Sequence, residues 1–148
     1  MVKIFTVGTH AYDHKIQLFI NDMAKHGITV LVDVRSVPYS SWQTIFNREN
    51  LRRKLQDVGL TYVWKGKCLG GKTWPDKPEG YSEGLEWLKK KAETETVCIM
   101  CMEPDPEKCH REMWIGEDLR KMGVEVEHII RNPKAKKNPN HRLTKFFR

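Results

Sequence analysis

Short apolar runs recur along the chain and alternate with longer segments in which apolar residues have a helical spacing. Residues 2–7 alternate apolar and polar positions, and residues 28–34 form a nearly continuous β-branched run, as in strands that are covered on both faces. Similar runs occupy residues 61–64, 96–102 and 124–130. The pattern therefore predicts five strands.

Four amphipathic segments connect these runs, and they cover residues 13–27, 47–59, 81–93 and 109–123. In the first segment, Gly27 marks the expected end of the helix. Strict alternation of strand and helix is typical of α/β proteins. We therefore expect a Rossmann-like three-layer sandwich with a mainly parallel five-stranded sheet, helices on both faces and the strand order 3-2-1-4-5.

The positive charge of the chain is concentrated at its end. The net charge is +7, yet residues 1–130 carry 19 basic and 19 acidic residues, whereas residues 131–148 carry seven basic residues and no acidic one. We therefore expect one α/β domain over residues 1–130 and a basic tail over residues 131–148. A signal-peptide pattern and an apolar stretch of ~20 residues are both lacking, so we expect a cytoplasmic protein without membrane contact.

Polar clusters follow three of the predicted strands. They are Gly8, Thr9 and His10 after the first strand, Asp33 and Arg35 at the end of the second, and Cys101, Glu103, Cys109, His110 and Arg111 after the fourth. The carboxyl ends of parallel strands meet at one edge of a sheet, where ligands bind. We therefore expect these side chains to line one crevice.

The residue types in this crevice suit anion binding and acid–base or covalent chemistry. Cys109 stands at the predicted start of a helix, where backbone N–H groups lower the pKa of a thiol, so it is the candidate nucleophile. The candidate catalytic residues are Cys109, Asp33, Glu103 and His110, and the candidate ligand-binding residues are Gly8, Thr9, His10, Arg35, Gly70, Gly71, Cys101 and Arg111.

Two of these assignments have a structural alternative. Asp33 and Arg35 lie two apart in an extended segment, so they also suit an ion pair that ties the end of the sheet to a neighbouring helix. Cys109 also suits the role of a small buried residue that packs at the start of a helix. The sequence leaves both alternatives open.

The four cysteines favour reduced thiols or a metal site over a disulfide framework, since three of them lie within twelve positions. By count alone, Cys98, Cys101, Cys109 and His110 offer four zinc ligands. Positions three apart on a strand point to opposite faces, so Cys98 should enter the core while Cys101 reaches the strand end. We therefore predict no metal site and no cofactor.

Two long connections, residues 35–46 and 65–79, are candidates for function. The second brings Lys67, Lys72 and Trp74 around a Gly-Gly pair, a combination suited to phosphate contact and base stacking. Solvated lysines on a surface loop are the alternative. The candidate nucleic-acid-binding residues are Lys67, Lys72, Trp74, Lys134, Lys136, Lys137 and Arg142.

Several motifs together resemble one known family. They are TVGTH near the start, LVDVRSVP, YVWKGKCLGG, CMEPDPEKCHR and a final VEVEHI, and as a set they resemble the domain of unknown function 488 family. The resemblance implies a small Rossmann-like α/β domain and adds Pro38 and Leu69 to the motif residues named above. The chain departs from the usual Gly-His-Ser of that family in placing Thr9 before His10. The resemblance implies no reaction.

Two functions follow as hypotheses. The first is a protein that binds an anionic small molecule, phosphate-like or nucleotide-like, in the crevice, with enzymatic turnover as an open question. The alternative is a non-catalytic module that binds DNA or RNA through the basic tail and residues 65–77.

Overall fold

Five short strands form the middle layer of the fold. In the computed structural model, which describes residues 2–131, the strands are β1 (Lys3–Gly8), β2 (Val30–Asp33), β3 (Thr61–Trp64), β4 (Val97–Cys101) and β5 (Glu125–His128). Each of them lies in or extends by one residue a run that the sequence pattern indicated. All four neighbouring pairs are parallel, so the predicted parallel sheet is confirmed.

The strand order is 3-2-4-1-5, and the predicted order 3-2-1-4-5 is wrong. β4 lies between β2 and β1, where Val97 pairs with Val30 on one side and with Ile4 on the other. Both β1 and β4 are almost entirely buried. Their composition therefore suits either central position, and only the pairing itself separates the two orders.

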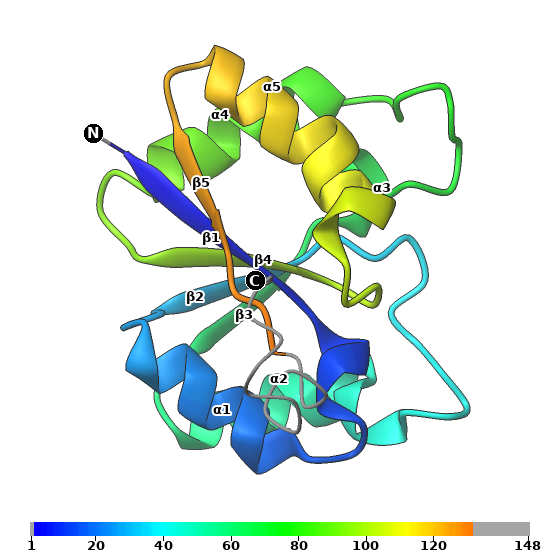
Figure 1. Ribbon diagram of the computed structural model, residues 1–148, viewed down its shortest axis with the longest axis vertical. Helices are drawn as coiled ribbons and strands as arrows, with labels where there is room; N and C mark the ends of the chain where they lie inside the picture. The colour runs from blue at the N-terminus through cyan, green and yellow to red at the C-terminus, as the bar shows by residue number, and fades with distance from the viewer. Residues whose placement is uncertain (1, 132–148) are drawn as a thin grey trace, which may run out of the picture.

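Helices cover both faces of the sheet (Figure 1). The lower layer in the figure contains α1 (Ile16–Lys25) and α2 (Arg48–Asp57), and the upper layer contains α3 (Gly66–Leu69), α4 (Tyr81–Lys91) and α5 (Glu117–Lys121). Right-handed crossovers place their helices on one face while the chain moves in one direction along the sheet, and on the other face after it turns back. The chain turns back after β3, which accounts for the three-layer α/β fold.

The sheet separates two apolar cores. Phe19 of α1 and Leu51 of α2 belong to one core, and Leu88 of α4 and Leu119 of α5 belong to the other. Alternate residues of β4 contribute to both cores because side chains on a strand point alternately to its two faces. Cys98 lies in the α1–α2 core and Cys101 in the α4–α5 core, so the predicted divergence of these two thiols is confirmed.

Short helical segments lie in the connections that follow β1, β2 and β4. They are η1 (Thr9–Tyr12), η2 (Thr44–Phe46), η3 (Pro106–Lys108) and the π-helical η4 (Arg111–Gly116), which continues directly into α5. Within residues 2–131, no helix has the length and apolar character needed to cross a bilayer. The tail residues proposed for nucleic-acid binding, Lys134, Lys136, Lys137 and Arg142, lie outside the described residues.

Candidate functional site

A cavity of about 590 Å³ opens at the carboxyl ends of β1 and β4. These strands are neighbours, and the chain leaves them over opposite faces of the sheet, through α1 and α5. In open α/β sheets, ligands bind at such a point because the diverging connections leave a crevice. The residues that line the cavity are His10, Gly71, Trp74, Cys101, Met102, Glu103, Lys108, Cys109, His110 and Met113.

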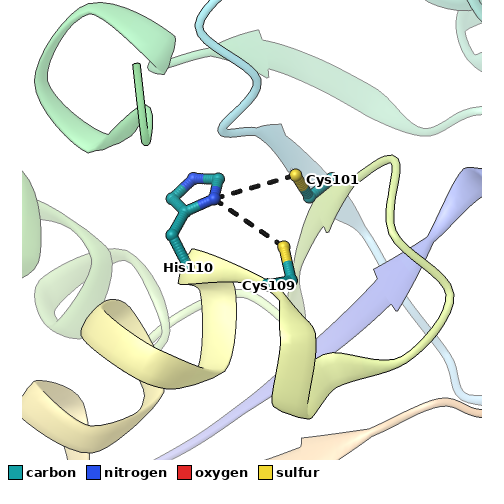
Figure 2. Close-up of side chains that lie close together, drawn as sticks. All are labelled: Cys101, Cys109 and His110. Atoms are coloured by element: carbon teal, nitrogen blue, oxygen red, sulfur yellow. Dashed lines mark hydrogen bonds between the residues drawn. The ribbon is translucent and has the colours of Figure 1, made fainter. Parts of the chain in front are cut away.

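Cys101, Cys109 and His110 converge in the wall of this cavity (Figure 2). His110 Nδ1 lies 3.8 Å from Cys101 Sγ and 3.7 Å from Cys109 Sγ. The other ring nitrogen, Nε2, lies 3.2 Å from the carbonyl oxygen of Val34. A carbonyl only accepts hydrogen bonds, so Nε2 carries the ring proton and Nδ1 presents its lone pair to the two sulfur atoms.

The two thiols have opposite pKa shifts. A hydrogen bond with Cys109, backbone N–H groups and the charge of Arg111 lower the pKa of Cys101 to about 7, against the effect of burial. The same hydrogen bond and burial raise the pKa of Cys109 to about 12. The prediction of a lowered pKa at Cys109 is therefore wrong, because this thiol is buried and lies beside Cys101, whose negative charge disfavours a second thiolate.

Asp33 and Arg35 form a buried ion pair outside the cavity. Arg35 donates from Nη2 and Nε to the two oxygens of the Asp33 carboxylate at 2.7 Å and 2.9 Å, and from Nη2 to the Phe46 carbonyl at 2.8 Å. The Tyr62 hydroxyl donates to the same carboxylate at 2.5 Å. Both charged side chains are at most 2% exposed. The structural alternative, an ion pair that ties the sheet end to a helix, is the arrangement found, with η2 as the helix.

The predicted single crevice with Asp33, Arg35 and Cys101 in its wall is wrong because the sheet lies between them. Asp33 is bound by Tyr62 and its partner Arg35 by Phe46, and both of these aromatic residues pack in the α1–α2 core. Cys101 belongs to the opposite core. The two groups end neighbouring strands at the same edge, yet they point to opposite faces.

Arg111 is fully buried and holds the loop after β4 in place. Its Nε donates to Thr6 Oγ1 at 3.1 Å, and its terminal nitrogens donate to the carbonyl oxygens of Glu103 and Pro104. The side chain does not line the cavity, so it is not placed for the predicted direct contact with an anion there. Within residues 2–131, no carboxylate forms an ion pair with Arg111, and its charge acts on Cys101.

Of the three candidate residues at or after the end of β1, only one lines the cavity. A Cβ at Gly8 would lie 2.0 Å from the carbonyl oxygen of Glu103, so this glycine permits a close backbone approach and does not line the cavity. Thr9 is fully buried, and its hydroxyl has no hydrogen-bond partner. His10 does line the cavity, and its ring packs edge-on against Trp42 at 5.0 Å. His10 is therefore the residue of this cluster that is placed to reach a ligand.

The connection after β3 contributes one side of the cavity. Trp74 lines it, stacks on Trp114 at a centroid distance of 5.0 Å and remains 53% exposed. Gly71 packs closely against the His110 ring, where a Cβ would meet Cγ at 3.0 Å. Gly70 approaches Ser36 in the neighbouring loop instead, and the exposed Lys67 and Lys72 do not line the cavity.

Sequence reasoning missed three lining residues: Met102, Lys108 and Met113. Lys108 directly precedes Cys109, so its adjacency to a motif was an available signal. Met102 and Met113 resemble ordinary core residues in the sequence, and no pattern separates them from the core.

The chain was compared with family models, curated proteins and solved structures. The model of a family described as "Domain of unknown function DUF488" matches residues 15–80 and 75–115. No curated protein and no solved structure matches the chain. The matched range includes Cys101, Cys109 and His110, and it stops short of His10 at its amino end.

Proposed function

The chain belongs to the DUF488 family, whose description assigns no activity, and we propose that it binds an anionic, nucleotide-like small molecule in the cavity at the carboxyl ends of β1 and β4. The observation that carries this proposal is a buried cation beside the cavity: Arg111 is fully buried, and no carboxylate within residues 2–131 pairs with it. A buried cation that no carboxylate neutralises makes the local potential positive, and this favours an anion in the adjacent cavity.

The lining adds a second cationic group. Lys108 is exposed at the cavity and free to approach a phosphate, while His10 offers a ring nitrogen. Glu103 is the acidic member of the lining, and its carboxylate already accepts the backbone N–H of Asp105 at 3.0 Å. The cationic groups therefore favour the charged end of a ligand on the Lys108 side.

The remaining lining suits a flat, apolar ring. Trp74 presents an exposed indole that is held in place by its stack on Trp114, and Met102 and Met113 supply polarisable apolar surface. Ligand pockets are typically apolar with a few polar groups that fix orientation. A ligand with a phosphate group and an aromatic base matches both parts of this lining.

Turnover of the ligand would use the titratable groups of the same lining. Cys101, whose pKa is lowered to about 7, Glu103 and His10 are the side chains placed to give or take a proton there. Asp33, a candidate from sequence, has its carboxylate oxygens bonded to Arg35 and Tyr62 and lies outside the cavity. It is therefore not part of the proposed chemistry.

Isothermal titration with ADP, inorganic pyrophosphate and uncharged adenosine tests this function. We expect ADP to bind more tightly than adenosine, and Lys108→Ala to weaken ADP and pyrophosphate by roughly 10- to 100-fold, as loss of a bond to a charged group of about 1.5–3 kcal/mol implies. Trp74→Ala should weaken ADP and leave pyrophosphate unchanged. Lys67→Ala, an exposed lysine away from the cavity, is the matched control.

Equal affinity for ADP and adenosine, or full affinity in Lys108→Ala, would contradict the proposal. The nucleic-acid alternative makes a different prediction: salt-sensitive binding of an oligonucleotide that is lost on deletion of residues 131–148 and kept in Lys108→Ala. The two hypotheses are therefore separated by the same pair of proteins.

A further inference from the structure

We propose that Cys101, Cys109 and His110 bind one Zn²⁺ ion and leave its fourth coordination position open to the cavity. The three residues each offer one ligand atom, and these atoms all lie within 4.8 Å of one another. The inference goes beyond the anion-binding function and does not depend on it. It revises the prediction of no metal site, which considered Cys98 an essential fourth ligand.

The distances fit a tetrahedral ion. With zinc–sulfur bonds of about 2.3 Å and zinc–nitrogen bonds of about 2.0 Å, tetrahedral angles separate a sulfur from a nitrogen by about 3.5 Å. The Nδ1 atom of His110 lies 3.8 Å and 3.7 Å from the two sulfurs. The nitrogen–sulfur distances are therefore a few tenths of an ångström longer than in a tetrahedral site. The two sulfurs, which lie within 4.8 Å of each other, close to about 3.8 Å when an ion binds between them.

The imidazole is oriented as in a typical zinc site. Metal-ligating histidines usually donate their other ring N–H to a carbonyl or carboxylate, which fixes the tautomer and the plane of the ring. His110 Nε2 lies 3.2 Å from the Val34 carbonyl oxygen, and Gly71 packs against the ring itself. A single Nδ1 lone pair accepts one S–H, so hydrogen bonding alone explains only one of its two sulfur contacts.

The backbone that carries the two cysteines is fixed by the sheet and by hydrogen bonds from Arg111. Cys101 ends a buried strand, and Cys109 follows the short η3 turn. Arg111 donates to the carbonyl oxygens of Glu103 and Pro104, so it fixes the loop that runs from one cysteine to the other. The spacing of the two sulfur atoms is therefore set before any ion binds.

The donor set selects the metal. Two thiolates and one imidazole favour Zn²⁺ over hard cations such as Mg²⁺ and Ca²⁺, which prefer oxygen ligands. On binding, the two thiols release their two protons to solvent, and the two thiolates balance the charge of the ion. Cys98 lies in the opposite core, and all three ligands line the cavity, so the fourth position faces the cavity, as in catalytic zinc sites.

The test measures metal content and ligation in the reduced full-length protein. We expect one zinc per chain by elemental analysis, and, after exchange with Co²⁺, absorption bands of thiolate-to-cobalt charge transfer. Cys101→Ser and Cys109→Ser should each lose most of this binding. Cys68→Ser changes a half-buried thiol outside the cluster and is the matched control that keeps it.

A second readout uses the unchanged protein and so does not depend on how the variants fold. With zinc bound, two fewer thiols should react with a disulfide reagent than in the chelator-treated protein. Absence of stoichiometric zinc from the reduced protein, full zinc binding in Cys101→Ser, or a cobalt spectrum without thiolate bands would each overturn the site. Loss of the metal site with ADP binding intact would refute this inference alone and leave the anion proposal standing.

Discussion

Replacing Arg35 with alanine tests whether the Asp33–Arg35 pair is structural. The change removes the two bonds to the Asp33 carboxylate and the bond to the Phe46 carbonyl. The carboxylate then stays buried, with the Tyr62 hydroxyl and the backbone N–H of residue 35 as its donors. Loss of one partner from a buried ion pair costs about 3–5 kcal/mol. We expect Arg35→Ala to lose this much of a total of about 5–15 kcal/mol.

Urea denaturation followed by circular dichroism measures this loss. Arg52→Ala is the matched control, because Arg52 pairs with Glu49 on the surface, with both side chains more than 40% exposed, and such pairs contribute about 0–1 kcal/mol. The double variant Asp33→Leu with Arg35→Met should recover most of the stability, since no charge is left buried. A loss in Arg35→Ala no larger than that in Arg52→Ala, together with weaker pyrophosphate binding, would refute the structural assignment and support a ligand role.

Two further predictions concern the carboxyl half of the sheet. Burial lowers the pKa of His128, so its contribution to stability is present above the unfolded value of about 6.5 and is lost as the pH falls below it. Denaturation from about pH 8 to about pH 5.5 should show this slope, and His128→Gln should remove it. Gly8→Ala places a methyl group against the Glu103 carbonyl and should cost at least ~2 kcal/mol in thermal unfolding, and a smaller loss would mean that the loop after β4 yields.

Local sequence patterns predict the helices and strands of the fold, but they do not predict which strands lie next to each other in the sheet. The β-branched run at residues 28–34 and the amphipathic helices between the strands predict a parallel sheet. Gly27, with φ +69°, lies just past the end of α1, as its position in the sequence predicted. The order of β1 and β4 depends on pairing across the sheet. Because both strands are apolar and buried, their sequences carry no signal for it.

In the candidate site, too, the sequence predicts what is close along the chain but not what depends on the packing of the sheet. Cys101, Glu103, Cys109 and His110 lie within ten residues of one another, and all of them line the cavity. Such proximity along the chain is visible in a sequence. The position of Arg35 on the far face of the sheet is not, because it depends on which core each strand position enters.

Arg111 was misassigned for a related reason. An arginine at the start of a helix suits an anion, but this side chain instead bonds to Thr6, which lies more than a hundred positions earlier in the chain, and to two carbonyl groups. Partners at that separation leave no local pattern. The convergence of two thiols on Nδ1 of His110 likewise depends on the turn at η3.

Backbone amide shifts measured during titration with inorganic pyrophosphate show whether an anion binds in the cavity at the carboxyl ends of β1 and β4. We expect the largest shifts at His10, Met102, Lys108 and His110, which line one cavity although they come from two parts of the chain. Shifts confined to residues 65–73 or to the tail after residue 131, with the ends of β1 and β4 unchanged, would contradict it.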